Sequence, residues 1–251
     1  MGRSYNGGME RRILIVETGQ PVASMRRHGG FPHWIRHAAG VHHRGFDVVD
    51  VERGAAPPAP GRHAAVIVTG SAAMVTDRHG WSERSADWLR GVVGSGMPVL
   101  GICYGHQLLA HAFGGEVGPN PRGREMGTVA IELHAEAADD PLFRGLPRRF
   151  AAHATHLQSV LRPPDGAVLL AANAHDPAHA LRIGDRAWGV QFHPEFSVAH
   201  MRGYIAARAE ALRGEGADPA ARIGAVRAAP VARTVLRRFV QLAHRGAGAF
   251  G

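Results

Sequence analysis

Short, continuous apolar runs alternate with amphipathic segments along the first half of the chain. The apolar runs cover residues 12–17, 46–51, 64–69 and 98–102. Such runs are typical of parallel strands that are buried on both faces. Apolar residues at helical spacing predict helices over residues 32–43, 81–93 and 104–113. Strands that alternate with helices predict an α/β fold, flavodoxin-like, with an open, mostly parallel central sheet and helices on both faces.

The second half of the chain is richer in strand patterns, and its helices come late. Strands are predicted over residues 128–133, 150–160, 167–172 and 187–192. Apolar stripes predict two later helices, at 198–212 and 231–242, and residues 218–230 form the loosest segment between them. We therefore expect one domain over residues 1–251, with a core at about 12–196 and a C-terminal helical extension at about 197–245.

Composition narrows the classes of function. The chain has a single cysteine, which excludes an internal disulfide framework and favours a cytoplasmic location. No apolar run approaches the roughly 18 residues that cross a bilayer, so no membrane association is expected. The formal net charge is +8, but the arginines are scattered and form no long basic run. We attribute the charge to a solvated surface and expect no nucleic-acid partner.

The one cysteine occupies a position that suits a nucleophile. Cys103 stands between Gly101 and Gly105, where the strand at 98–102 is predicted to turn into the helix at 104–113. A helix N-terminus carries partial positive charge and free N–H groups, which favour a thiolate. A lone cysteine is most often a small buried hydrophobe. Glycines on both sides of a sharp turn are otherwise wasteful for packing, so this context favours the nucleophile.

A base and an orienting carboxylate follow much later in the chain. His193 and Glu195 flank Pro194, directly after the strand pattern at 187–192. The ends of parallel strands meet at one edge of a sheet, so His193 is expected beside Cys103. Neither His193 nor Glu195 would carry a signal alone, since the chain has 17 histidines. Together with the cysteine turn they predict a Cys-His-Glu triad.

Attack on a carbonyl also requires hydrogen-bond donors for the developing oxyanion. The backbone N–H of Tyr104, directly after the nucleophile, is one candidate. Gly70, at the end of the strand at 64–69, is the other. The neighbouring Ser71 lacks a Gly-x-Ser-x-Gly context and is interpreted as a turn residue.

The histidines give no prediction of a metal centre. His42-His43 and the pair His153 and His156 have no identifiable partners that would complete a set of ligands. We expect neither a metal nor another cofactor.

These segments resemble class I glutamine amidotransferases, and most closely the amidotransferase domain of GMP synthase. The resemblance spans about residues 12–196 and rests on Gly101-Ile102-Cys103-Tyr104-Gly105-His106-Gln107, Gly114-Gly115, Arg124-Glu125-Met126-Gly127, His156, and Gly189-Val190-Gln191-Phe192-His193-Pro194-Glu195. It implies Cys103 as nucleophile, His193 as general base and acid, and Glu195 as orienting group. It also implies a γ-glutamyl thioester, and glutamine contacts from Gly70, Gln107, Met126, Gly127, Thr128 and His156.

The chain departs from this family pattern at three points. The usual Gly-Gly-Pro strand end is replaced by Thr69-Gly70-Ser71, so the oxyanion role of Gly70 rests on its position. Gln158 stands where the GMP synthase branch commonly has an acidic residue. No P-loop and no pyrophosphatase-type nucleotide motif follows the triad. We therefore expect that the chain does not synthesise GMP by itself.

Three functions remain compatible with the sequence. The first is a glutamine amidotransferase, or glutaminase, that releases ammonia for an acceptor, and its partner would be a synthetase subunit. The second is a γ-glutamyl peptidase, which uses the same thioester chemistry but a different leaving group. The third is a catalytically silent binding or regulatory subunit that retains the fold.

Overall fold

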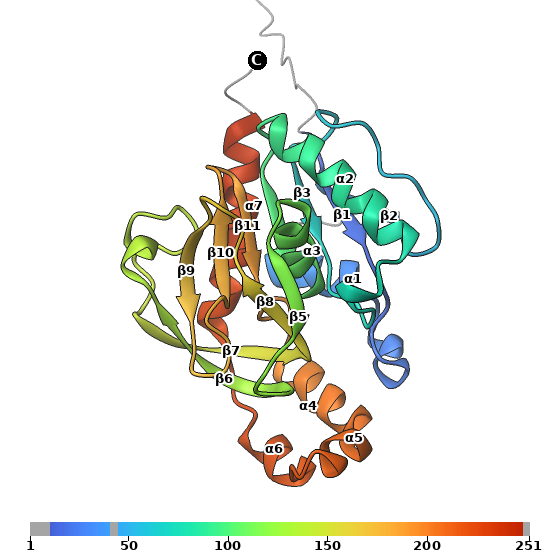
Figure 1. Cartoon of the computed structure of the whole chain (residues 1–251), viewed down its shortest axis with the longest axis vertical. Helices are drawn as coiled ribbons and strands as arrows, with labels where there is room; N and C mark the ends of the chain where they lie inside the picture. The colour runs from blue at the N-terminus through green and yellow to red at the C-terminus, as the bar shows by residue number, and fades with distance from the viewer. Residues whose placement is uncertain (1–10, 41–44, 248–251) are drawn as a thin grey trace, which may run out of the picture.

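The computed structural model describes residues 11–40 and 45–247, which contain a nine-stranded sheet with helices on both faces (Figure 1). The strand order is β2-β1-β3-β4-β11-β10-β9-β6-β7, and β5 and β8 form a separate two-stranded sheet. The strands are β1 (Ile13–Glu17), β2 (Phe46–Asp50), β3 (Ala65–Val68), β4 (Val99–Ile102), β5 (Glu116–Pro119), β6 (Glu125–Leu133), β7 (Arg149–His156), β8 (Gln158–Arg162), β9 (Val168–Ala172), β10 (Ala180–Ile183) and β11 (Ala187–Val190). The helices are α1 (Phe31–Ala39), α2 (Gly80–Gly94), α3 (Tyr104–Ala112), α4 (Val198–Ala207), α5 (Ala209–Gly214), α6 (Pro219–Ala225) and α7 (Pro230–Ala247), with short 3-10 turns η1 (Ala23–His28), η3 (Val75–Asp77) and η4 (Ala135–Ala138).

The sheet has a parallel half and an antiparallel half. Strands β2, β1, β3, β4 and β11 run parallel, whereas β10, β9, β6 and β7 continue the sheet by antiparallel pairing. The predicted α/β fold with an open, mostly parallel sheet is confirmed. Because β3, β4 and β11 are neighbours, the segments that follow them meet at one edge of the sheet.

Apolar side chains on the two faces of the parallel strands form separate cores. In β1, Ile13 and Ile15 pack in the core that contains α1 and α7, whereas Leu14 and Val16 pack in the core that contains α2 and α3. This alternation explains why the parallel strands are continuous apolar runs: each side chain enters one core or the other.

The C-terminal extension departs from the sequence prediction. The apolar stripe at 198–212 predicted one helix, but the helix breaks at Arg208 into α4 and α5. The segment at 218–230, expected to be loose, contains α6. Helices α4, α5 and α6 form a lobe at the bottom of Figure 1, packed through a third apolar core that includes Trp34 and Phe196.

Other differences lie at short elements. Strands β5 and β10 were not predicted: β5 (Glu116–Pro119) is exposed at both ends and ends in a proline, and the apolar residues of β10 (Ala180–Ile183) are interrupted by Arg182. The strand predicted at 150–160 is interrupted at Leu157, so that β8 leaves the main sheet to pair with β5. The helix predicted at 32–43 ends at Ala39, and the His42-His43 pair lies outside the described residues. In the part of the chain that the structure describes, no helix has the length and hydropathy needed to cross a membrane.

Candidate active site

Cys103 lies in a sharp turn between β4 and α3. Its backbone has φ 51° and ψ −100°, a positive-φ conformation that costs a residue with a side chain about 1–3 kcal/mol. Its N–H donates to the carbonyl of Val190 at 2.8 Å, which ties the turn to β11. A Cβ atom at Gly101 would lie 2.3 Å from the carbonyl oxygen of Gly105, and a Cβ atom at Gly105 would lie 2.5 Å from that of Val68. Only glycine fits at these two positions, which explains why glycines stand on both sides of the predicted turn.

The segment after β11 brings a histidine and a carboxylate to the same edge. His193 Nδ1 lies 2.7 Å from Glu195 Oε1, and both side chains are buried. The His193 ring is stacked on Phe196, with 4.1 Å between the ring centroids. A Cβ atom on Gly70 would lie 3.1 Å from His193 Cε1 and 3.8 Å from Cys103 Cβ, so the ring and the thiol flank the same glycine. The structure thus places the three predicted triad residues together.

The electrostatics of the site favour a charged His193. Burial alone would lower its pKa, but attraction from Glu195 and Cys103, together with the hydrogen bond to Glu195, raises the pKa of His193 to about 10. By contrast, burial lowers the pKa of the neighbouring His153 and of His200 to about 4. Within this cluster, positive charge at neutral pH is therefore concentrated on the imidazole beside Cys103.

A pocket of about 210 Å³ opens over Cys103. Its walls come from the loops after β1 and β3, the start of α3, the β7–β8 turn and the end of α4, and they are Gln20, Val22, Phe31, Ser71, Ala72, Ala73, Met74, Cys103, Tyr104, Gln107, Arg124, Thr155, His156, Leu157, Gln158, His193, Tyr204 and Arg208. No aspartate or glutamate is among these walls. Because Arg124, Arg208 and the charged His193 are among them, the pocket suits a small ligand that carries negative charge.

Comparison with known proteins identifies the family. The sequence model of the class-I glutamine amidotransferase family matches residues 21–209. The chain belongs to this family. It is 41% identical over 134 residues to the GMP synthase [glutamine-hydrolyzing] of Aeropyrum pernix, a match that covers 53% of this chain and 24% of that protein. It is 43% identical over 105 residues to one subunit of the GMP synthase [glutamine-hydrolyzing] of Thermococcus kodakarensis, covering 41% of this chain and 53% of that one.

Solved structures show the same fold. A glutamine amidotransferase of Methylobacillus flagellatus superposes with a TM-score of 0.73 at 24% identity, over 95% of this chain and 94% of that chain. A glutamine amidotransferase of Thermotoga maritima superposes with a TM-score of 0.71 at 20% identity, over 92% and 99%. The matches to the GMP synthases of Aeropyrum pernix and Thermococcus kodakarensis cover 24% and 53% of those proteins, so the chain spans only part of the length of these relatives.

The predicted oxyanion donors lie next to the nucleophile in this amidotransferase fold. Tyr104 is the first residue of α3, where backbone N–H groups have no partner within the helix. The Gly70 N–H belongs to the peptide whose carbonyl is that of Thr69, and this carbonyl accepts from the N–H of Gly105 at 3.1 Å and from the hydroxyl of Thr18 at 3.0 Å, which fixes that peptide beside the start of α3. Ser71 accepts from the N–H of Ala73 at 3.0 Å, the contact expected of a turn residue.

Of the predicted glutamine contacts, Gln107 and His156 line the pocket. The Gln107 amide nitrogen donates to the carbonyl of Gln158 at 2.7 Å and to Gln191 Oε1 at 2.9 Å, which leaves its oxygen as the group it can offer a ligand. His156 has both ring nitrogens engaged, Nδ1 with the carbonyl of Gln158 at 3.0 Å and Nε2 with Glu125 at 2.9 Å. His156 thus acts as a buried support for the pocket wall.

Met126, Gly127 and Thr128 lie on β6 and do not line the pocket. The Met126 side chain packs in the core of the lobe, and its carbonyl accepts from Arg222 at 2.7 Å. Gly127 has φ 134°, a conformation that favours glycine. The Thr128 hydroxyl accepts from the N–H of Arg227 at 3.2 Å. The structure therefore gives no pocket contact to support substrate binding by these three residues, which join β6 to the lobe.

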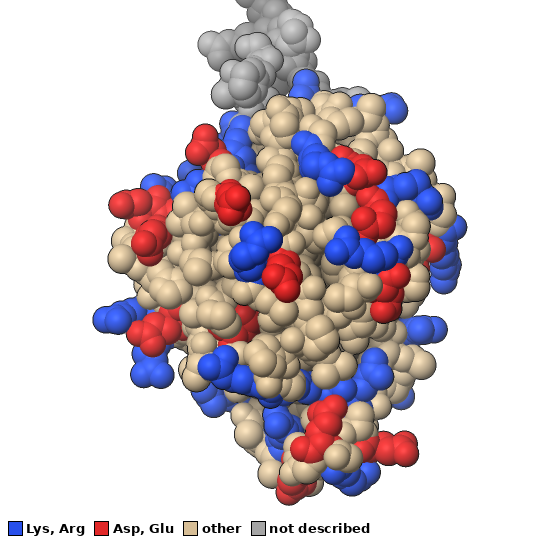
Figure 2. Space-filling view, in the orientation of Figure 1, with Lys and Arg blue, Asp and Glu red and all other residues tan. Residues whose placement is uncertain are grey.

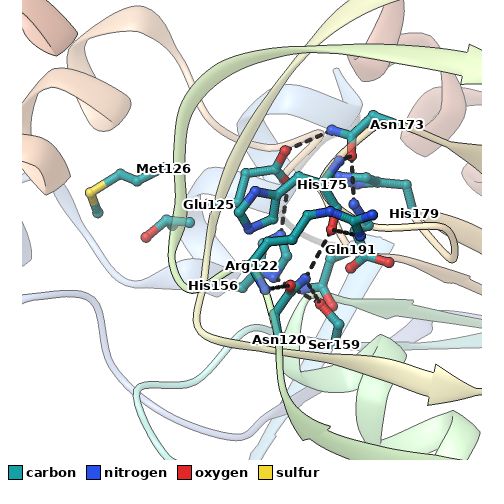
Figure 3. A network of polar contacts seen from close by, with 12 residues as sticks. Asn120, Arg122, Glu125, Met126, His156, Ser159, Asn173, His175, His179 and Gln191 are labelled. Atoms are coloured by element: carbon teal, nitrogen blue, oxygen red, sulfur yellow. Dashed lines mark hydrogen bonds and ion pairs between the residues drawn. The ribbon is translucent and has the colours of Figure 1, made fainter. Parts of the chain in front are cut away.

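A buried ionic network that the sequence did not reveal contacts His156, which lines the pocket; Figure 3 shows this network. Glu125 Oε2 accepts from His156 and from His179 at 2.9 and 2.7 Å, and its Oε1 accepts from Asn173 at 2.6 Å. Ligand atoms of Glu125, His156 and His179 all lie within 4.8 Å of one another and are of the types that bind zinc. In this structure they contact each other directly, so each carboxylate oxygen already has a partner.

Glu125 is expected to contribute strongly to folding stability. Burial alone would raise its pKa, but hydrogen bonds and attraction from His156 and His179 hold the pKa of Glu125 well below its ordinary value of 4.5. Glu125→Gln should lower the free energy of unfolding at pH 7 by about 3–5 kcal/mol, measured by urea denaturation. A depressed pKa stabilises the fold above pH 4.5 and loses its effect as the pH falls, so the difference from wild type should shrink in acid.

The matched control is Glu215→Gln. Glu215 pairs with Arg124 at 3.0 Å but is 39% exposed, so this change should cost at most about 1 kcal/mol. Equal losses in the two variants, or a Glu125→Gln difference that does not change with pH, would contradict a stabilising role for the network.

Proposed function

We propose that this amidotransferase hydrolyses the γ-amide of glutamine through a γ-glutamyl thioester on Cys103 and releases ammonia. The observation that carries the proposal is the placement of Cys103 and His193 against the same glycine, with Glu195 2.7 Å from the far nitrogen of the imidazole. An imidazolium beside the thiol favours the thiolate, which is the nucleophilic form.

The reaction follows from these positions in two halves. The Cys103 thiolate attacks the γ-carbonyl carbon, and the carbonyl electron pair moves onto oxygen. His193 then gives its proton to the amide nitrogen, so the C–N bond breaks and ammonia leaves the thioester. In the second half, water attacks the thioester carbonyl, His193 takes the proton from the water, and the thiolate leaves as glutamate forms. Backbone N–H groups of Tyr104 and Gly70 serve as the oxyanion donors in both halves.

The size of the pocket favours glutamine over a γ-glutamyl peptide. At about 210 Å³ the pocket is smaller than the roughly 300–1,000 Å³ typical of drug-sized ligands. An amino acid fits such a volume better than a peptide does. The Gln107 oxygen, freed by the two bonds of its amide nitrogen, serves as an acceptor for an N–H of the substrate.

Arg208 is the group in this pocket best suited to the substrate's α-carboxylate. It stands at the break between α4 and α5 and lines the pocket. The other arginine of the pocket wall, Arg124, is already paired with Glu215 through contacts of 3.0 Å. Arg208 forms no ion pair with another residue of the described chain, so its guanidinium is available to a carboxylate.

Glutamate release from glutamine, from γ-glutamyl dipeptides and from glutathione tests the proposed activity in the purified full chain. Turnover of glutamine above the peptides supports the proposal, and strong turnover of peptides supports the peptidase instead. Absence of glutamate from every substrate would indicate a silent binding or regulatory subunit. Because the relative in Thermococcus kodakarensis is one subunit of a GMP synthase, an acceptor synthetase is the expected partner, and the screen is repeated with co-purified proteins.

Arg208→Gln is expected to raise the KM for glutamine by about tenfold while kcat changes little, because a hydrogen bond to a charged group contributes about 1.5–3 kcal/mol. Steady-state kinetics should be compared with glutaminamide, in which a carboxamide replaces the α-carboxylate. Wild type should prefer glutamine strongly, and the variant should lose most of that preference.

Arg213→Gln serves as the control, since Arg213 lies on α5 and does not line the pocket. If Arg208→Gln discriminates between glutamine and glutaminamide as well as wild type does, the carboxylate contact must be assigned to another group.

A further inference from the structure

A second recess, lined by arginines, lies apart from the amidotransferase pocket. Its volume is about 500 Å³. It is formed by the loop that contains Pro141 and Arg144, the turn before β11 and the last turns of α7. Its walls are Pro141, Arg144, Arg186, Arg238, Gln241, Leu242 and Arg245. Four of these seven residues are arginines, and none is acidic.

The recess is at the far end of the sheet from Cys103. Arg186 directly precedes β11, whereas His193 follows that strand. Arg186 Nη1 also reaches the carbonyl of Gly96, just before β4, at 3.4 Å. At least one four-residue strand, about 13 Å in length, therefore separates the recess from the catalytic residues. A ligand in the recess would not contact the substrate of the amidotransferase pocket.

Two acidic residues that adjoin the recess segments in sequence contact Arg182 and not the arginines of the recess. Asp140 precedes the recess loop, but its Oδ2 accepts from Arg182 at 3.1 Å and from Trp188 at 3.0 Å. Asp185 precedes Arg186 and lies 3.8 Å from the same Arg182. None of the four arginines of the recess forms an ion pair with a residue of the described chain. On the face shown in Figure 2, by contrast, basic and acidic side chains are interspersed.

Part of this cationic set is fixed in position. Arg238 Nη1 donates to the carbonyls of Leu142 and Arg144 at 3.1 and 2.6 Å, which leaves its other N–H groups free. Arg144 and Arg245 have no such backbone tether among the described residues. The C-terminal carbonyls of α7 attract a cation, but a helix end carries only about half a negative charge. The helix end therefore does not balance four guanidinium groups.

We propose that this recess binds a small molecule that carries two or more phosphate groups. Guanidinium groups remain charged at all relevant pH values and match phosphate oxygens with paired N–H donors. Several positive charges in one recess favour a ligand with several negative charges over a single phosphate. The volume lies within the range of small-molecule sites, and Pro141 and Leu242 offer apolar surface to the rest of the ligand. The ligand class is thus that of nucleoside di- and triphosphates or of related diphosphate compounds.

Isothermal titration calorimetry of the full chain tests this proposal. The ligands are pyrophosphate, ADP, ATP and inorganic phosphate, in a buffer with 150 mM salt, which is about the physiological ionic strength. We expect the compounds with two or three phosphates to bind, and inorganic phosphate to bind at least tenfold more weakly. The double variant Arg144→Gln/Arg245→Gln should weaken binding of ADP and ATP at least tenfold. These two arginines are chosen because neither holds a backbone carbonyl as Arg238 does.

The matched control is Arg202→Gln/Arg213→Gln, which removes the same charge from α4 and α5 of the lobe. Equal weakening in both double variants would show that overall charge, and no built site, attracts the anions. Failure of pyrophosphate, ADP and ATP to bind the wild type would overturn the proposal. Binding only of an acidic polymer such as heparin would also overturn it and indicate a macromolecular partner. The assay requires no catalysis, and Cys103→Ala should bind these ligands as wild type does, so its outcome is independent of the proposed glutaminase activity.

Discussion

Cys103→Ala is expected to abolish glutamate release from glutamine, with a loss of at least about 10³-fold in kcat. The thiolate forms the covalent bond that divides hydrolysis into two easier steps, and alanine offers no nucleophile in its place. Coupled detection of glutamate with wild type and variant at equal concentration measures the loss. Because the chain has a single cysteine, a glutamine-like chloroketone should add once to the wild type and not to the variant, as mass spectrometry would show.

The backbone at this position supplies a control for folding. Cys103 has φ 51°, a conformation that glycine adopts without strain. Cys103→Gly should be as inactive as Cys103→Ala but more stable to urea, by about 1 kcal/mol. Wild-type turnover in either variant would disprove the thioester. An inactive wild type whose cysteine resists the chloroketone would favour a silent binding subunit.

The candidate catalytic residues were predictable where one short peptide holds both the reactive side chain and the neighbours that determine its position. Gly101 and Gly105 leave no room for a side chain, so the turn around Cys103 is visible in the sequence itself. His193 and Glu195 are two residues apart, and the short loop after β11 suffices to bring them together. Each of these features depends on neighbours along the chain, which a local pattern can report.

Residues that reach the pocket from distant segments gave no such signal. Arg208 faces the pocket because the helix breaks there, and the apolar stripe continues through the break without a proline or glycine to mark it. Glu125 was part of a recognised motif, yet its role depends on His179, which lies on a loop 54 residues later. Pairings at this distance in sequence arise from the sheet order β10-β9-β6-β7, which no single segment encodes.

The parallel half of the sheet was also easier to predict than the antiparallel half. Strands buried on both faces are uninterrupted apolar runs, as in β1, β3 and β4. In the antiparallel half the strands have mixed exposure, and β7 passes into β8 with a single residue, Leu157, between them. A polar residue occurs both on the exposed face of such a strand and in a loop. The pattern of polar and apolar residues therefore did not locate the boundary between β7 and β8.

The second large effect is expected from Glu195→Gln. In wild type, Glu195 Oε1 accepts from His193 Nδ1 at 2.7 Å. Glutamine keeps the shape of the side chain and an oxygen that can accept this hydrogen bond, but it has no negative charge. Burial lowers the pKa of His193, and without the Glu195 charge only the Cys103 thiolate still raises it. The pKa of His193 should therefore fall from about 10. We expect kcat/KM for glutamine to fall by about 10²-fold at pH 7, within the range that acid–base catalysis contributes.

The pH profile distinguishes this electrostatic role from simple support of the ring. His193 must hold a proton to give to the leaving nitrogen, so activity in wild type should decline only as the pH approaches the raised pKa of His193, about 10. In Glu195→Gln the alkaline decline should begin at lower pH, because the imidazolium loses its proton earlier. Glu195→Asp, which retains the charge, should lose activity through geometry while its alkaline limb stays nearer to that of wild type. If both variants keep the wild-type alkaline limb, Glu195 orients the ring without setting its charge, and the thiolate alone must hold the proton on His193.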